Sequence, residues 1–244
     1  MLLDKLNIIL NSSDEFSPKY IISSFVKNNL YEIPSMSIDA IALSCHTSKS
    51  QISKYVKSLG YETMKDFKDA CLDNISGMER TNKTLFSLQN SIKKQYTDFT
   101  TNIIDELHFT MNQIDEINLL KLVSDLKKSK RIFVYGHGHA RTLCTYIQNE
   151  LSAKQKETII CDVDFEKEYN FQDSDLLLLI SINGDTFHFN KRVIHHILKY
   201  SVNTWLISCK DHIDFPKNYL YIPTINDQYN DYLLRHILDF ILMY

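Results

Sequence analysis

The segment RIFVYGHGHAR, residues 131–141, decides the fold expected for the C-terminal part of this chain. Its apolar run at 132–135 is typical of a short buried strand, and a helix-like stretch follows at 140–151. Gly136 and Gly138 stand between the two, where a sharp turn needs backbone freedom. Because backbone N–H groups at the start of a helix can face an anion, this segment predicts a strand–turn–helix unit with a candidate anion site.

A second segment, LLLLISINGDT at residues 176–186, repeats this arrangement. Its apolar run is typical of a central parallel strand that is buried on both faces. Further strands are expected at 158–160, 204–208 and 219–222, with helices at 193–199 and from 227 onward. Strands that alternate with helices in this way predict a three-layer α/β domain with a five-stranded parallel sheet. The carboxyl ends of its strands converge on one crevice, where ligands bind.

The N-terminal part contains SIDAIALSCHTSKSQISKYVKSLG, residues 37–60, which has the spacing of two short helices joined by a tight turn. Ser37 and Ser48 are suitable N-terminal caps, and Ile52 and Val56 are placed for the core. The remaining side chains of the second helix are of the kind that reach phosphates and base edges in a major groove, although any three-helix unit also has a polar face. The expected DNA-contacting residues are Thr47, Ser48, Lys49, Ser50, Gln51, Ser53, Lys54 and Lys57.

Several stretches of this region resemble the N-terminal helix-turn-helix domain of RpiR-type transcriptional regulators. They are IDAIA at 38–42, TSKSQISKY at 47–55, LGY at 59–61 and DFK at 66–68. Lys54 stands where the family usually has arginine. The lysine keeps the positive charge but lacks the guanidinium group that can form two parallel hydrogen bonds. The resemblance covers about residues 1–75. It implies a dimer that places two recognition helices in successive major grooves of a pseudo-palindromic operator.

The two glycine-containing loops resemble those of SIS domains, the sugar-isomerase fold of aminosugar-phosphate enzymes and of the C-terminal part of RpiR-type regulators. This resemblance spans roughly residues 107–244 and implies a sugar phosphate as effector. Two positions depart from the family pattern, because Ala140 and Asn183 stand where serines usually occur. The candidate ligand-binding residues are Gly136, His137, Gly138, His139, Arg141, Ser181, Asn183, Gly184 and Thr186.

The two missing hydroxyl donors leave three outcomes open for the crevice. Arg141, His137 or His139 supplies the anion contacts instead, arginine being well suited to phosphate. Alternatively, the crevice binds a different ligand, or the domain has lost ligand binding and serves as a dimerisation scaffold. The two histidines are also consistent with partly exposed loop residues that contact no ligand.

The expected domain organisation follows from a polar stretch around Gly77. The predicted parts are a helix-turn-helix DNA-binding domain at 1–76, a helical linker at 77–106 and a SIS-like effector-binding and dimerisation domain at 107–244. Residues 85–130 carry apolar side chains at helical spacing without proline or glycine, which predicts one or two long helices that transmit the ligand signal. A basic cluster suits the end of the last of these helices: Lys127, Lys128, Lys130 and Arg131.

Other polar residues of the second domain are more typical of surface or packing positions than of catalysis. They are Glu150, His195 and His196. The apolar pattern of the final helix predicts packing on the sheet or on a partner subunit. We therefore expect no catalytic residue, no metal site and no cofactor.

The overall composition is that of a globular protein, with 44% hydrophobic and 23% charged residues and a net charge of -3. The total charge gives no indication of nucleic acid, although DNA attraction depends on where the lysines lie. Five cysteines without metal-type spacing favour a reduced, cytoplasmic setting. No apolar run approaches the length of about 20 residues that a membrane span needs, so no membrane partner is expected.

These observations predict a DNA-binding transcriptional regulator that senses a phosphorylated sugar and controls sugar-metabolism genes. The expected partners are a double-stranded DNA operator, a sugar phosphate and further copies of the chain in a homodimer or homotetramer. One alternative is a sugar-phosphate isomerase, against which stand the weakened phosphate loops and the lack of a clear acid/base pair. The other is a ligand-independent DNA-binding dimer with a degenerate SIS domain.

Overall fold

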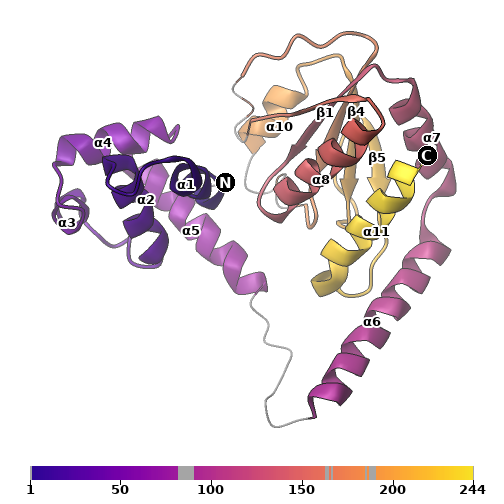
Figure 1. The fold of residues 1–244 in the computed structure, drawn as a ribbon, viewed down its shortest axis with the longest axis horizontal. Helices are drawn as coiled ribbons and strands as arrows, with labels where there is room; N and C mark the ends of the chain where they lie inside the picture. The colour runs from indigo at the N-terminus through magenta and orange to yellow at the C-terminus, as the bar shows by residue number, and fades with distance from the viewer. Residues whose placement is uncertain are drawn as a thin grey trace. The chain divides into compact units, whose positions relative to one another are not determined.

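The computed structural model describes residues 2–81, 91–162, 165, 167–184, 186 and 191–243 (Figure 1). Contacts between Cα atoms divide the chain into two compact units, Met1–Thr84 and Leu85–Tyr244. In the part of the chain that is described, no helix has the length and apolar character needed to cross a bilayer.

The first unit is helical. Its elements are α1 (Leu2–Ser12), α2 (Pro18–Asn28), α3 (Ile38–Ser44), α4 (Lys49–Ser58) and α5 (Met64–Thr81). Ser17, Ser37 and Ser48 cap α2, α3 and α4, because each side chain accepts a hydrogen bond from the backbone N–H three residues further on. The structure thus confirms the two caps predicted from the sequence.

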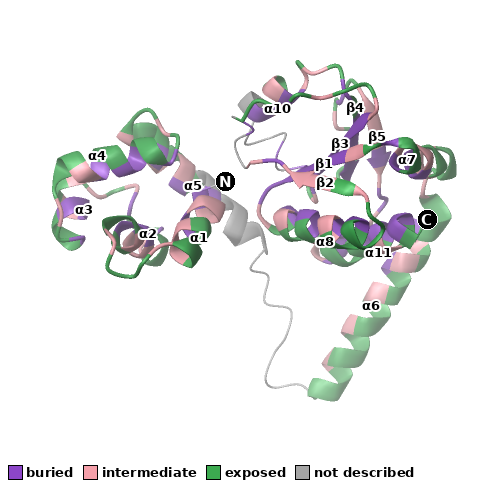
Figure 2. Cartoon of the chain, turned by 45° about the horizontal axis from the view of Figure 1, so that its top comes forward, coloured by how far each residue is buried: buried purple, intermediate pink, exposed green. Residues whose placement is uncertain are grey.

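Apolar side chains from all five helices form the core of the first unit. The most deeply buried include Leu6, Ile22, Ile41, Ile52 and Phe67. Because both α3 and α4 contribute to this core, their relative position is fixed by packing, and the opposite side of α4 faces solvent (Figure 2).

The second unit begins with α6 (Ile92–Gln113) and α7 (Glu116–Lys128) and contains a five-stranded sheet. The strands are β1 (Arg131–Gly136), β2 (Glu157–Ile160), β3 (Asp175–Ile180), β4 (Asn203–Ser208) and β5 (Asn218–Tyr221). They pair in the order β2-β1-β3-β4-β5, and every pairing is parallel. The remaining described elements are α8 (His139–Ala153), α10 (Lys191–Ile197), the 3-10 helix η1 (Asp227–Tyr229) and α11 (Asn230–Met243). The predicted five-stranded parallel sheet is confirmed.

The sheet is buried on both faces, which gives the three layers expected from the sequence. Ile132 and Val134 of β1 pack into a core with α7, α8 and α11. The alternate residues Phe133 and Tyr135 pack on the other face with α10 and aromatic residues that follow β2. Figures 1 and 2 show α8 and α11 together on one side of the sheet and α10 on the other. The apolar side of α11 belongs to the core that contains Ile132 and Val134, so α11 packs on the sheet.

One detail of the predicted domain organisation differs. The polar stretch around Gly77, from which the sequence predicts a boundary, is helical, because α5 continues through Gly77 to Thr81. The predicted domain limits at 76/77 and 106/107 stay predictions, and both positions fall inside helices, α5 and α6. Residues 82–90 of the predicted linker lie outside the described residues.

A second difference concerns Arg131, which the sequence predicts at a helix end and which begins β1 instead. Its Nε and Nη2 atoms donate to the two carboxylate oxygens of Asp175, at 3.0 and 2.6 Å, across the β1–β3 pair. Burial alone would raise the pKa of the Asp175 carboxyl, but the hydrogen bonds from Arg131 and from the Gln172 amide outweigh it and lower the pKa. Only Lys127 and Lys128 occupy the last turn of the helix, α7.

Candidate functional site

The outward face of α4 carries the residues predicted to contact DNA. Ser48, Lys49, Ser50, Ser53, Lys54 and Lys57 are exposed, and Thr47 and Gln51 are half-buried. Ile52 and Val56 are buried, as predicted from their spacing. Ser48 has a structural task, since its Oγ accepts from the Gln51 backbone N–H at 3.2 Å. Lys49 forms an ion pair with Asp39 of α3 at 2.5 Å, and the two side chains remain exposed, at 61% and 60%.

The turn between α3 and α4 is tight and slightly strained. His46 adopts a φ of 50°, in the left-handed region that a residue with a Cβ atom seldom occupies. The next backbone N–H, that of Thr47, donates to the carbonyl of Ala42 at 2.9 Å and closes the turn. The first two residues of α4, Lys49 and Ser50, follow this turn and are exposed.

Tyr55 is a contributor to this site that sequence reasoning missed. It lies on the buried side of α4, and its hydroxyl is 2.6 Å from Ser23 Oγ of α2. Burial raises the pKa of Tyr55 to about 12, with the Ser23 hydrogen bond opposing the shift, so the hydroxyl stays protonated at neutral pH. The contact ties α4 to α2 and holds the exposed face in position. A buried tyrosine beside Val56 is compatible with the apolar pattern, but its partner on α2 cannot be deduced from spacing.

The two predicted ligand loops meet at the point where the strand order reverses. From β1 the chain moves to β2 on one side, and β3, β4 and β5 follow on the other side. Gly136 at the end of β1 pairs in register with Ile180 at the end of β3. The loops after these two strands therefore lie side by side, at the topological switch point where open α/β sheets bind ligands.

The first loop depends on both of its glycines. A Cβ atom at Gly136 would lie 3.0 Å from the Cβ and carbonyl oxygen of Ala140 and from Cys144 Sγ, so only glycine lets α8 approach the strand this closely. Gly138 precedes α8 with φ 54° and ψ -127°, a conformation that side chains disfavour. Ala140, which stands where SIS domains usually have serine, is buried at 2% exposure.

The polar side chains of the first loop make internal contacts. His137 is buried against Tyr135, whose hydroxyl hydrogen-bonds to His137 Nε2. The interpretation of His137 as a partly exposed loop residue is therefore wrong, because the ring turns toward the aromatic core. Arg141 donates to the carbonyl of Cys161 just beyond β2. His139 is the exposed member of the loop, with 79% of its side chain accessible, and its Nδ1 lies 3.4 Å from an Asp231 carboxylate oxygen.

The second loop is compact. Ser181 Oγ donates to Thr186 Oγ1 at 3.2 Å, and both residues are buried. Gly184 has a φ of 77°, and a Cβ atom there would lie 2.8 Å from Lys210 Cγ. Asn183 is exposed and accepts from Asn230 Nδ2 at 2.7 Å. Asp185, which belongs to the same motif, lies outside the described residues.

The first turn of α11 contacts both predicted ligand loops, an arrangement that sequence reasoning missed. Asn230 contacts the second loop through Asn183, and Asp231 contacts the first loop through His139. An Asn-Asp pair at a helix start suggests capping alone, so local spacing does not indicate that these residues touch both loops. The predicted surface or packing positions agree with the structure: Glu150 and His195 are exposed and His196 is half-buried.

Two buried cysteines lie just beyond β2 and β4. Burial raises the pKa of Cys161 to about 12 and also raises the pKa of Cys209. Both thiols therefore stay protonated at neutral pH and are poor nucleophiles. Among the residues that the structure describes, no cluster of three His, Cys, Asp or Glu side chains has the arrangement needed for a metal ion.

Comparison with known proteins supports the sequence resemblance. No family model matches the chain. The curated HTH-type transcriptional regulator GlvR of Bacillus subtilis (strain 168) is 21% identical over 182 residues, which is 72% of this chain. This chain spans 63% of the length of that relative. The match confirms the predicted resemblance to RpiR-type regulators.

Two solved structures share the fold. The Vibrio vulnificus NanR protein complexed with ManNAc-6P has 16% identity and a TM-score of 0.50, and the match covers 100% of this chain and 90% of NanR. The Escherichia coli CFT073 protein c3406, solved in complex with a ligand, has 11% identity and a TM-score of 0.51, covering 62% of this chain and 88% of c3406. The likeness confirms the predicted fold class, a helical N-terminal unit followed by a SIS-like α/β unit.

Proposed function

We propose that this chain, which resembles RpiR-type regulators in sequence and in fold, is a cytoplasmic DNA-binding transcriptional regulator of sugar-metabolism genes. Its second unit senses a phosphorylated sugar. The observation that carries the proposal is the exposed basic face of α4, which a packed core and a tight turn hold at the surface of the first unit. The regulator GlvR, which aligns with 72% of the chain, supports the same conclusion.

DNA binding would use the outward residues of α4 in two ways. Lys49, Lys54 and Lys57 contact phosphates, which gives affinity and orientation. Gln51, near the first turn, is suited to a base edge because its amide can donate and accept at once. In the complex a phosphate replaces Asp39 as the partner of Lys49, an exchange that costs little because both side chains are exposed in the free protein.

Ligand sensing would use the crevice at the β1–β3 switch point. The NanR structure, which shares this fold, was solved with ManNAc-6P, and this supports a phosphorylated sugar as the effector. Hydroxyl groups of Ser181 and Thr186 and the side chains of His139 and Arg141 are the donors that this chain offers to a phosphate. They stand in for the two serines that the family pattern has at Ala140 and Asn183.

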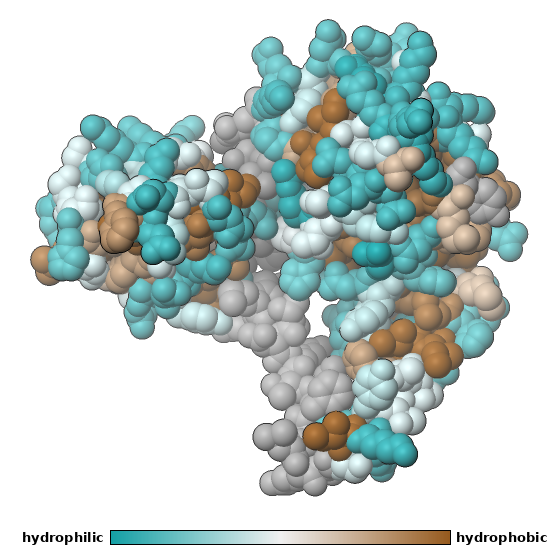
Figure 3. Space-filling view, viewed as in Figure 1, coloured by the Kyte–Doolittle hydropathy of each residue, from teal (hydrophilic) through white to brown (hydrophobic). Residues whose placement is uncertain are grey.

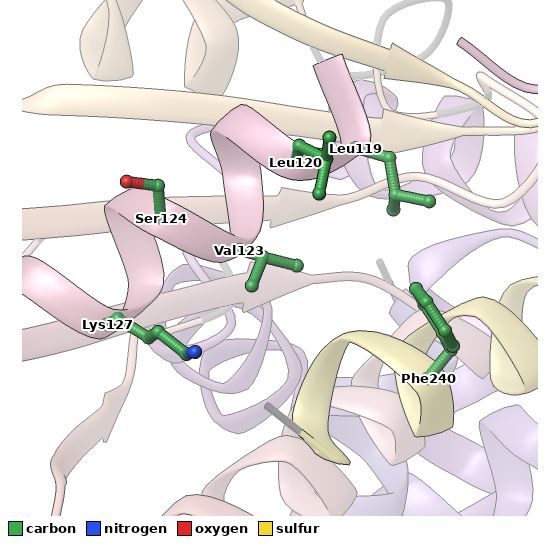
Figure 4. Close-up of a pocket in the computed structure, with 6 residues that line it drawn as sticks. All are labelled: Leu119, Leu120, Val123, Ser124, Lys127 and Phe240. Atoms are coloured by element: carbon green, nitrogen blue, oxygen red, sulfur yellow. The ribbon is translucent and has the colours of Figure 1, made fainter. Parts of the chain in front are cut away.

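A homodimer is supported by an apolar surface on α7 and α11. A groove of about 320 Å³ lies there, lined by Leu119, Leu120, Val123, Ser124, Lys127 and Phe240, and Figure 4 shows Phe240 pointing from α11 toward α7. Leu120 is 68% exposed. Hydrophobic side chains are also exposed along α6 (Figure 3). Exposed apolar surface of this kind marks protein–protein contacts. A Leu120→Glu variant should sediment as a smaller species than the unmodified chain if this surface forms the dimer.

Transmission of the ligand signal would pass through α6, the helix that leads into the α/β unit. Its buried Glu106 accepts hydrogen bonds from the backbone N–H groups of Ile225 and Asn226, at 3.0 and 2.6 Å. One turn further on, Thr110 Oγ1 donates to the carbonyl of Pro223 at 2.7 Å. These bonds join α6 to the segment between β5 and α11. The first turn of α11 borders the proposed crevice. If this segment has two conformations and the ligand binds the protein more tightly in one of them, ligand binding would shift α6.

The deciding experiment is a gel shift on the DNA upstream of the protein's own gene. Unmodified protein should bind in a sequence-specific and salt-sensitive way, and Lys49→Ala and Gln51→Ala should weaken binding. An affinity change on adding a sugar phosphate would support the sensing half. Absence of binding to this DNA and to a random operator library would overturn the regulator proposal.

We assign no catalytic role to the crevice. Its polar side chains make the internal contacts described above, and its carboxylate at Asp231 is half exposed, with 52% of the side chain accessible. A sugar-phosphate isomerase needs a positioned acid/base group at the reacting carbons. Turnover assays with aldose and ketose phosphates test this directly, and a measurable isomerisation rate would favour the enzyme alternative.

A further inference from the structure

We propose that Asn230, the first residue of α11, is a specificity-determining part of the ligand crevice and accepts a hydrogen bond from a hydroxyl group of the bound sugar. The inference rests on the proposed sugar-phosphate sensing and adds to it a residue and a chemical group of the ligand. Asn230 lies outside both glycine loops, so nothing in the family's loop pattern points to it.

The first observation is an unpaired acceptor. Asn230 is only 4% exposed, and within the described parts of the chain its Oδ1 is a buried side-chain oxygen that has no hydrogen-bond partner. Buried polar groups are nearly always paired in folded proteins, because an unpaired group has lost water without compensation. The missing donor is therefore expected from outside the chain.

The second observation is where that amide lies. Its Nδ2 donates to Asn183 Oδ1 at 2.7 Å, in the loop after β3. The backbone carbonyl of Asn230 faces Cys209 Sγ at 3.8 Å, just beyond β4. Since Oδ1 and Nδ2 belong to one planar group, the unpaired oxygen is held among the carboxyl ends of the strands, which is where the ligand crevice forms.

The chemistry of the position selects the kind of ligand group. A carbonyl oxygen attracts a hydroxyl donor and repels a phosphate oxygen. The neighbouring Asp231 adds a negative charge to the same turn of α11. This side of the crevice therefore suits the hydroxyl-bearing part of a sugar, and the phosphate belongs with the donor side chains of the first loop.

The departure of Asn183 from the family's serine gains a reason from this arrangement. Its exposed amide fixes the orientation of the Asn230 amide and leaves Oδ1 of Asn230 for the ligand. Asn183 thus acts as a positioning residue. It also offers a variant that is safe for folding, because its side chain is exposed.

The experiment is isothermal titration of the full-length protein with glucose 6-phosphate, ManNAc-6P, arabinose 5-phosphate and inorganic phosphate. For each sugar phosphate that binds, Asn230→Ala should weaken binding about tenfold, which is the loss expected for one net hydrogen bond. Asn183→Ala should weaken it by a smaller factor. Inorganic phosphate should bind both variants and unmodified protein alike. Asn112→Ala, an exposed asparagine of α6, is the matched control and should change nothing.

Monodeoxy analogues of the bound sugar phosphate identify the hydroxyl. One analogue should bind the unmodified protein about tenfold more weakly than the parent sugar, and Asn230→Ala should bind the two equally. Circular dichroism shows whether Asn230→Ala folds. If it does not, the inference is tested by titrating the monodeoxy analogues into the unmodified protein and by the Asn183→Ala variant, which changes an exposed side chain.

The outcomes separate this inference from the function on which it rests. Equal affinity of a folded Asn230→Ala variant for every sugar phosphate overturns the inference and leaves sensing intact. If Asn230→Ala does not fold, the inference is overturned when the unmodified protein binds all monodeoxy analogues as tightly as the parent sugar phosphate. Failure of the unmodified protein to bind any sugar phosphate overturns both the sensing half of the proposed function and this inference.

Discussion

The face of α4 and the crevice of the α/β unit differ in how their polar groups are engaged. On α4, apart from the cap at Ser48, the exposed Lys49–Asp39 pair and the half-buried Thr47 and Gln51, the predicted contact residues are exposed to solvent. In the crevice, polar side chains make contacts with each other or with the backbone, as the buried Ser181–Thr186 pair illustrates. Most predicted contact side chains on α4 are therefore accessible to a partner, whereas those of the crevice are fixed by hydrogen bonds within the protein.

The difference reflects the size and charge of the partners that we propose. A DNA duplex is a large polyanion that supplies its own shape, so exposed cations on a rigid helix are sufficient to attract it. A sugar phosphate is small and must be recognised by groups at fixed positions, which internal hydrogen bonds provide. We therefore expect charge to dominate the effects of substitution on α4 and backbone geometry to dominate those in the crevice.

The largest expected effect follows from removing charge on α4. A triple variant with Lys49, Lys54 and Lys57 changed to alanine should bind operator DNA at least about 100-fold more weakly, because three phosphate contacts are lost. The slope of log affinity against log salt should fall by about 3. Fluorescence anisotropy at several salt concentrations measures both quantities.

A second triple variant is the matched control for that measurement. Lys19→Ala, Lys93→Ala and Lys94→Ala remove the same charge from exposed positions outside α4. The control should keep most of the affinity and most of the salt slope. Equal losses in the two variants would show that total charge, and not the face of α4, governs binding.

The next effect concerns the connection of α6 to the crevice. Glu106→Ala leaves two backbone N–H groups without their charged acceptor and should lower the free energy of unfolding of the second unit by about 2–3 kcal/mol. The single tryptophan, Trp205, is buried in this unit, so its fluorescence during urea unfolding reports the change. The ligand should also lose its influence on DNA affinity.

The neighbouring residue Asp105 provides the control for Glu106. It is exposed on the same helix, so Asp105→Ala should leave both the unfolding transition and the ligand response unchanged. A Glu106→Ala variant that keeps a normal ligand response would contradict the proposed route of transmission, even if its stability falls.

Backbone geometry in the crevice gives a smaller effect. Gly184→Ala forces a Cβ atom to within 2.8 Å of Lys210 Cγ at a φ of 77°, and should cost about 2 kcal/mol of stability. Calorimetric titration should find that sugar-phosphate affinity is lost and that DNA affinity without ligand is kept. In a Lys210→Gly background, which removes the steric contact, part of the loss should be recovered. Retained ligand affinity in Gly184→Ala would show that the loop is less constrained than its geometry indicates.

The sequence predicted those parts of the molecule that depend on local patterns. The apolar run at 176–180 and the pair Gly136 and Gly138 specify a strand and a strand–helix turn wherever they occur, because burial and backbone freedom are local requirements. The same holds for the Ser37 and Ser48 caps and for the buried side of α4. These elements therefore needed no knowledge of the rest of the chain.

The parts that were missed depend on contacts between residues far apart in the chain. Asn230 meets Asn183 across 47 positions, and Glu106 meets the Asn226 amide across 120. The sequence predicts Arg131 at a helix end because a cation is favourable there, and it does not show that a buried Asp175 lies on the neighbouring strand. Such pairings follow from strand order, which local spacing does not encode.

The turn before α4 offers the smallest effect and a test of whether the DNA-contacting face depends on local strain. His46 adopts a φ of 50° at an exposed position, and glycine has no Cβ atom to oppose that conformation. His46→Gly should raise the free energy of unfolding of the first unit by about 1 kcal/mol. Circular dichroism during urea unfolding measures the change. Trp205 fluorescence follows the unfolding of the second unit alone, and subtracting that transition leaves the transition of the first unit.

His46→Ala is the matched control, since it removes the same imidazole and keeps the Cβ atom. It should give no stabilisation, and both variants should keep the DNA affinity of the unmodified protein because the imidazole is not among the proposed contacts. If His46→Gly weakens DNA binding while His46→Ala does not, the strained turn itself orients α4, and the α4 site then depends on backbone geometry as the crevice does.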